Sequence, residues 1–132
     1  LFEIVVRKVV ATRPPELLAV MRAGVHRLEA LVEDAAGGDA YAETTHRLIQ
    51  ICARFAGNER LRRMIAALSL QSLRYSKLGL SSPERRRRSV KLWKQAARAL
   101  ERGDLEQMLL LSRQRSEESA NEAARLLGKP EA

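Results

Sequence analysis

The sequence predicts an all-α protein, an antiparallel bundle of about six helices. Aromatic residues make up only 4% of the 132 residues, while Ala, Leu, Arg and Glu are abundant, and this composition favours helices over sheets. Apolar residues recur at three- and four-residue steps, the spacing of one helix face. Gly, Pro and capping residues divide the chain into helix-length segments with short connections. A chain of this length forms one domain, residues 1–132.

The first part of the chain predicts two helices. Residues 1–11 are rich in Val and Ile, which is typical of a strand, but no other segment resembles a sheet, so we assign them to a helix. Pro14 and Pro15 break this pattern and suit the first turn of a second helix, which runs to about Asp34. Its buried stripe comprises Leu17, Leu18, Met21, Val25, Leu28, Leu31 and Val32.

The third and fourth helices are bounded by glycines and capping residues. Gly37 and Gly38 end the previous unit, and Asp39 is a suitable N-cap for the third helix. Gly57 ends that helix and Asn58 caps the fourth. The inner face of the third helix carries Tyr41, Thr45, Leu48, Cys52 and Phe55. The stripe of the fourth comprises Leu61, Met64, Ile65, Leu68, Ser72 and Tyr75.

The last two helices have the clearest start signals. Ser82 is placed as an N-cap with Pro83 at the first helical position of the fifth helix. Asp104, with Gln107 three residues later, forms a capping-box pattern for a sixth helix that reaches about Leu127. The fifth helix buries Val90, Trp93, Ala97 and Leu100 and closes at Gly103.

The basic residues are concentrated in residues 58–94, which hold eleven basic and two acidic residues. Such a segment attracts anions, although a solvated helix face with long Arg stems over apolar surface is an equal alternative. The run Arg85–Arg88 fans around its helix at about 100° per residue, so it cannot line one groove-facing stripe. It predicts a diffuse anion-attracting surface. The alternative hypothesis for function is a free-standing helical module that binds nucleic acid or protein through Arg60, Arg62, Arg63 and Arg85–Arg88.

Signatures of enzymes and of membrane proteins are missing from the sequence. It has no glycine-rich phosphate loop, no nucleophile elbow and no histidine–glutamate zinc motif, so we predict that the chain is not an enzyme. Cys52 is the only cysteine, which excludes an intramolecular disulfide and favours a reducing, cytoplasmic location. No apolar run approaches the roughly 18 residues of a membrane span. We interpret Cys52 and His26 as structural residues.

Two groups of polar residues fall where apolar residues are expected. His46 shares a helix face with Ala42, Ile49 and Ala53, which predicts a half-buried imidazole. The sixth helix carries polar side chains where its stripe should turn inward, and unpaired buried polar groups are unfavourable by roughly 1–3 kcal/mol. That half of the helix either faces solvent or lines a polar cavity whose other walls include Trp93 and His46. The polar positions are Ser112, Arg115, Ser116 and Ser119.

The segment His46–Asn58, followed by Glu-Arg-Leu, resembles the signature of the FCD domain. This is the all-helical effector-binding domain of FadR-type regulators in the GntR superfamily. Further similarity lies in Leu1-Phe2-Glu3, Ala11-Thr12-Arg13, Pro15-Glu16-Leu17, Ala96–Leu100 and Arg102-Gly103-Asp104. The resemblance implies a bundle that forms a homodimer and binds a small effector, usually a carboxylate or sugar acid. It also implies DNA binding through a winged helix-turn-helix domain that is not in this chain.

The resemblance also bears on metal binding, because many members hold a divalent metal with one aspartate and three histidines. Those positions fall here on Ala42, His46, Trp93 and Arg115, so three of the four ligands are replaced. We therefore predict no metal and no other cofactor. Arg115 restores a positive charge at a former ligand position, and guanidinium binds carboxylate through two parallel hydrogen bonds. In the alternative, Trp93 fills the site, Arg115 turns outward and the domain only dimerises.

The leading interpretation is thus a ligand-sensing domain of a DNA-binding transcriptional regulator. It binds a small organic acid without a metal, and its predicted ligand-binding residues are His46, Trp93, Ser112, Arg115 and Ser119.

Overall fold

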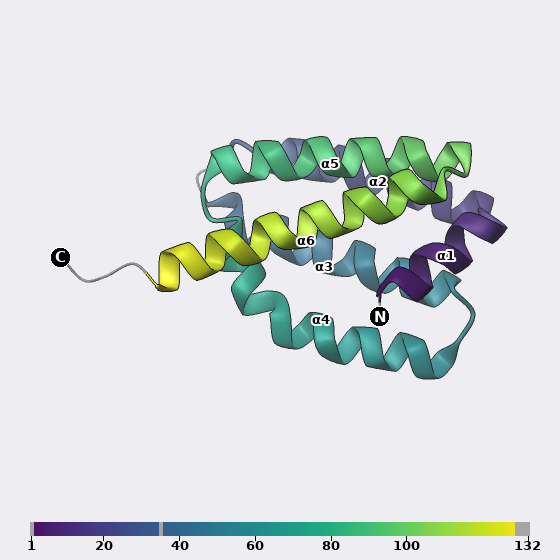
Figure 1. The fold of residues 1–132 in the computed structure, drawn as a ribbon. Coiled ribbons are helices and arrows are strands. Elements are labelled where there is room, and N and C mark those ends of the chain that lie inside the picture. Colours follow the sequence, from purple (N-terminus) through teal and green to yellow (C-terminus); the bar gives the residue numbers. More distant parts are fainter. Residues whose placement is uncertain (1, 35, 129–132) are drawn as a thin grey trace.

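Six helices and short connections make up the part of the chain that the structure describes, residues 2–34 and 36–128 of a computed structural model (Figure 1). No strand occurs within those residues, so the all-α prediction is confirmed. The helices are α1 (Phe2–Thr12), α2 (Pro15–Leu31), α3 (Gly37–Phe55), α4 (Glu59–Gly79), α5 (Pro83–Arg102) and α6 (Leu105–Leu127).

The helices form a bundle in which α3 and α6 lie between α4 on one side and α2 and α5 on the other (Figure 1). α3 packs against α1, α2, α4 and α5, while α6 packs against α1, α4 and α5. Within the described residues, α4 therefore has two main neighbours, α3 and α6, and several of its apolar side chains stay exposed. None of the helices in the described ranges is both long enough and apolar enough to cross a lipid bilayer.

The β-branched segment at the start of the chain forms a helix, as predicted. Its buried residues are Val5, Val6, Val9 and Val10, which recur at helical spacing. α1 packs this valine stripe against the bundle at α3 and α6. Burial of one apolar face outweighs the weak preference of valine for strands, because helix propensity differs by less than about 1 kcal/mol per residue.

Three predicted N-caps are confirmed. The side chains of Asn58, Ser82 and Asp104 accept hydrogen bonds from the backbone N–H groups of Leu61, Arg85 and Gln107, at 3.0, 3.3 and 3.0 Å. Each bond satisfies one of the free N–H groups in the first turn of its helix. Gly57 and Gly103 have φ angles of 75° and 70°, a left-handed conformation that glycine adopts without strain.

Two predictions about the connection between α2 and α3 are wrong. α2 ends at Leu31 and not near Asp34, whose carboxylate instead accepts a hydrogen bond from Ala36 N at 2.9 Å in the following turn. α3 begins at Gly37, so Asp39 lies inside its first turn and is not the N-cap. A carboxylate in that position is still favoured by the positive end of the helix dipole.

The apolar stripe predicted for α4 is only partly buried. Leu61 and Ile65 are buried, but Met64, Leu68 and Tyr75 are 47%, 48% and 45% exposed. Apolar spacing shows which residues share a face, but it does not show whether a neighbouring helix covers that face. The second half of α4 packs on α6 at Gly79 and borders a cavity before that point.

Arg86 is fully buried, so the prediction of a diffuse arginine surface is wrong for this residue. Its guanidinium donates four hydrogen bonds of 2.8–3.0 Å to backbone carbonyls. Val32 and Asp34 follow the end of α2, and Leu80 and Ser81 follow the end of α4. Arg86 thus satisfies carbonyls that a helix C-terminus leaves without partners and joins two loops that are far apart in the sequence.

The other arginines of the basic segment are mostly paired within the chain. Arg87 donates two hydrogen bonds to the Glu33 carboxylate, at 2.6 and 2.8 Å, and Arg88 lies 3.3 Å from Glu118. Arg62 and Arg63 both contact Glu59 near the start of α4. These pairs reduce the free positive charge on which a nucleic-acid-binding module would depend.

Candidate ligand-binding cavity

A cavity of about 640 Å³ lies between α3, α4, α6 and the N-terminal half of α5. Its walls include residues between Ile65 and Gly79 of α4, Leu80 directly after this helix, and residues between Arg115 and Leu127 of α6. This volume is within the range of small-molecule sites, roughly 300–1,000 Å³. Leu68 and Tyr75 line it and are nearly half exposed, so the cavity is accessible from solvent.

Close packing of α4 on α6 closes one end of the cavity. A Cβ atom at Gly79, the last residue of α4, would lie 2.5 Å from the carbonyl oxygen of Ser119. Non-bonded carbon and oxygen atoms do not approach so closely, and a backbone atom of α6 cannot move aside without shifting the helix. Glycine therefore lets the two helices meet where Gly79 and Ser119 line the cavity.

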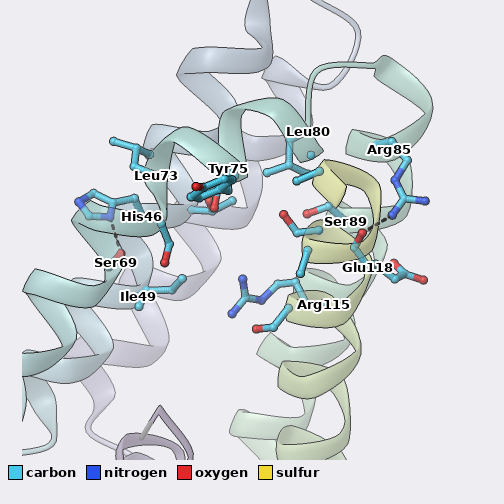
Figure 2. A pocket seen from close by; sticks show the side chains of 18 of the residues that line it. His46, Ile49, Ser69, Leu73, Tyr75, Leu80, Arg85, Ser89, Arg115 and Glu118 are labelled. Carbon is cyan, nitrogen blue, oxygen red and sulfur yellow. Dashed lines mark hydrogen bonds between the residues drawn. The ribbon is translucent and has the colours of Figure 1, made fainter. Parts of the chain in front are cut away.

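Arg115 places a positive charge in this cavity. Its guanidinium lies over the Trp93 ring, 4.6 Å from the centroid, and Figure 2 shows it pointing from α6 into the space toward α3 and α4. Burial lowers the pKa of Arg115 to about 10, so the group remains charged at neutral pH. A cation held against an aromatic face in this way is fixed in position and keeps its N–H donors for other partners.

No acidic group neutralises Arg115 among the described residues. The polar groups that act on it are the Cys52 thiol and the Tyr41 hydroxyl. Burial raises the pKa of each to about 12, so both are neutral at physiological pH. The Arg115 charge is therefore partly removed from water and lacks a counter-charge, an arrangement that favours binding of an anion.

His46 lies on α3 and lines the same cavity, half-buried as predicted. The Gln50 amide nitrogen lies 3.0 Å from Nε2 and donates to it, and Nδ1 is in hydrogen-bond contact with Ser69 Oγ (Figure 2). This pairing assigns the ring proton to Nδ1. Burial, with a smaller effect of Arg47, lowers the pKa of His46. The imidazole is thus neutral at pH 7 and both of its nitrogens are engaged.

The structure places three of the five predicted ligand-binding residues on the cavity wall: His46, Arg115 and Ser119. Trp93 is 5% exposed and does not line the cavity, but lies behind Arg115 and supports its guanidinium. Ser112, one turn before Arg115, does not line it either.

Several lining residues were missed by sequence reasoning. The Ser69 hydroxyl, which holds the His46 ring, and the charged residues Arg85 and Glu118 all lie on the wall. Arg85 donates to the Glu118 carbonyl oxygen at 2.7 Å. The sequence signal that could have indicated this part of the wall is the pair of polar residues Ser69 and Ser72 within the apolar pattern of α4.

The residues present do not fit a divalent metal. No group of three His, Cys, Asp or Glu side chains with metal-binding geometry occurs in the described part of the chain. Of the four positions named above, Ala42 offers no ligand atom and Trp93 is buried against a guanidinium. Arg115 would repel a dication, and both nitrogens of His46 are already engaged. Metal sites require several convergent donors, and this wall provides a cation instead.

In a comparison with protein families, residues 3–125 of the chain match the FCD domain. Neither curated proteins nor solved structures gave a significant match. The family match covers nearly the whole chain and includes the segment His46–Asn58, so the predicted resemblance to the FCD domain is confirmed. Membership of the FadR subfamily stays a prediction. The chain therefore belongs to the FCD domain family, the effector-binding domains of GntR-type transcriptional regulators.

Proposed function

We propose that this domain senses a small organic acid, which binds directly to Arg115 without a metal ion. The observation that carries the proposal is the Arg115 guanidinium, which faces a cavity of about 640 Å³ and lacks an acidic partner within the described residues. Ser119 supplies a hydroxyl group on the same wall, and the neutral ring of His46, held by Gln50 and Ser69, supplies an uncharged surface. The proposal also includes a homodimer in the cytoplasm and DNA contact through a winged helix-turn-helix domain outside this chain.

The electrostatics of Arg115 explain why an acid is favoured. Burial without a counter-charge destabilises the guanidinium, as its lowered pKa indicates. A bound carboxylate supplies that counter-charge through two parallel N–H···O bonds, which are stronger than hydrogen bonds between neutral groups. Neutral ligands of the same size gain no such energy. Arg115 therefore takes the part that a metal ion has in other members, as the fixed positive centre.

The alternative of a collapsed site is less well supported. It requires Trp93 to fill the space and Arg115 to turn outward. Trp93 instead lies behind Arg115, and about 640 Å³ stays open in front of the guanidinium. Ligand binding between α3, α4 and α6 can shift the population of bundle arrangements, which is the general route by which an effector changes the activity of an attached domain.

A thermal shift screen with organic acids tests this proposal. An acid that binds the folded domain stabilises it by about 2.7 kcal/mol at a hundredfold excess over Kd, which raises Tm by several degrees. Arg115→Gln is expected to reduce this rise to half or less, because loss of a charge-assisted contact weakens binding by about 1.5–3 kcal/mol. Arg98→Gln removes one charge from an exposed position of α5 outside the cavity and is expected to retain the full shift.

The controls separate binding from general charge effects. The screen is run in the presence of a chelator, so that the shift cannot depend on a metal. If acids raise Tm equally in the wild type and in Arg115→Gln, the charge at residue 115 is not the binding group and the proposal is wrong. If no acid raises the Tm of the wild type, the collapsed-site alternative is favoured.

A further inference from the structure

The charges around the cavity limit the ligand to one carboxylate. The charged side chains on its wall are Arg85, Arg115 and Glu118. Arg85 is engaged by the Glu118 carbonyl oxygen at 2.7 Å and by the Glu122 carboxylate at 3.9 Å. Within the described residues, Arg115 is thus the one cation of the wall that lacks a partner. A second carboxylate held inside the cavity would meet either apolar surface or the negative Glu118, and an unpaired charge removed from water is strongly unfavourable.

The wall away from Arg115 is largely apolar. Ile49 of α3 and Leu73, Tyr75 and Leu80 at the end of α4 surround the space into which the guanidinium points (Figure 2). Leu68 and Leu127 also line the cavity while 48% and 62% exposed. These two side chains leave apolar surface in contact with water, and an apolar ligand group would remove it from water.

The hydroxyl groups of the wall offer few partners to a polyhydroxylated ligand, because Ser72 and Ser76 of α4 stand among apolar side chains that include Leu68 and Leu73. Ser69 and Ser89 are already engaged, by His46 and by the Tyr41 hydroxyl, which donates to Ser89 Oγ at 2.9 Å. Ser116 and Ser119 lie one residue and about one helical turn beyond Arg115 on α6, where they can accompany a carboxylate at the guanidinium. A sugar acid needs hydrogen-bond partners along its whole length, and unpaired buried hydroxyls are unfavourable.

We infer that the ligand is a monocarboxylate with an apolar alkyl or aryl body: its carboxylate pairs with Arg115, and its body covers the apolar wall formed by α3, α4 and the end of α6. This inference rests on the proposed function, because it requires Arg115 to be the binding group. It excludes citrate-like polyacids and sugar acids as preferred ligands.

A titration followed by fluorescence tests the inference. Trp93 is the only tryptophan of the chain and lies against Arg115, so its emission reports a carboxylate that binds the guanidinium. The ligands are acetate, butanoate, hexanoate, octanoate and 3-phenylpropanoate, with citrate, gluconate and neutral octanamide for comparison. Affinity is expected to rise about fourfold for each buried methylene, and hexanoate is expected to bind at least tenfold tighter than citrate or gluconate.

Matched variants on α4 locate the body of the ligand. Leu68→Asn alters an exposed residue of the apolar wall and is expected to weaken octanoate several-fold while leaving acetate unchanged. Leu70→Asn makes the same change at a 65% exposed residue of the same helix that does not line the cavity, and it is expected to leave both affinities unchanged. An equal effect of the two variants would overturn the placement of the body.

The ligand series distinguishes failure of the inference from failure of the proposed function. If citrate or gluconate binds through Arg115 and the alkyl acids do not, the inference is wrong and the proposed function stands. If octanamide binds as tightly as octanoate, the ligand binds through its apolar body without use of the carboxylate, and both the inference and the proposed function are wrong. If none of the acids binds, the proposed function fails together with the inference.

Discussion

Replacing Arg86 with leucine is expected to lower the free energy of unfolding by about 3–5 kcal/mol. The substitution removes four hydrogen bonds to backbone carbonyls beyond the ends of α2 and α4. Leucine fills part of the volume, but it leaves buried acceptors without donors, and each such acceptor is unfavourable by about 1–3 kcal/mol. Urea denaturation followed by circular dichroism measures the change.

Two further substitutions show whether geometry or charge accounts for this effect. Arg86→Lys retains the charge but has a compact ammonium that cannot match the fork of the guanidinium, so it is expected to recover only part of the lost stability. Arg87→Gln removes the neighbouring arginine, whose ion pair with Glu33 is exposed, and is expected to change stability by no more than about 1 kcal/mol. A loss below 1 kcal/mol for Arg86→Leu would contradict the structural role of Arg86.

Replacing Trp93 with alanine is expected to lower the free energy of unfolding by about 3–5 kcal/mol. The indole is 5% exposed and supports the Arg115 guanidinium, so the truncation leaves a void and also releases the cation. Trp93→Phe retains a ring at this position. Because Trp93 Nε1 has no hydrogen-bond partner among the described residues, phenylalanine loses volume but no hydrogen bond, and it is expected to be much less destabilising than alanine.

The two Trp93 variants also differ in their expected effect on ligand binding. Trp93→Phe keeps an aromatic face for Arg115 and is expected to bind acids with nearly wild-type affinity, whereas Trp93→Ala leaves the guanidinium without support and is expected to bind them more weakly. Denaturation and calorimetric titration of the same samples provide both comparisons. Equal stability of the alanine and phenylalanine variants would show that the indole is not packed as described.

The helices could be predicted from the sequence because their signals are local. Asn58, Ser82 and Asp104 cap helices through backbone groups three residues away. Both partners of each hydrogen bond therefore lie within one short segment of the sequence. The apolar repeat of α5 similarly identifies the residues that it buries. The start of α3 was misplaced because Asp39 suits both an N-cap and a first-turn position, and only the backbone conformation separates the two.

Features that depend on distant segments could not be predicted. Arg86 stands in a run of four arginines, and its burial follows from carbonyls of Val32 and Asp34, which are more than 50 residues away. The exposed residues Met64, Leu68 and Tyr75 of α4 follow the same apolar spacing as the residues of a buried helix face. Trp93 lies on the expected helix, but the rotation of α5 about its own axis places the indole behind Arg115 and not on the cavity wall.

Calorimetric titration of the wild type and of Arg115→Gln, in the presence of a chelator, tests the central claim most directly. The titrant is the acid that gives the largest thermal shift in the screen. We predict one acid bound per domain in the wild type and an affinity about 10- to 150-fold lower in Arg115→Gln, the equivalent of about 1.5–3 kcal/mol. Equal affinities in the two proteins, or wild-type binding that appears only after a divalent metal is added, would contradict a site that holds its acid through Arg115.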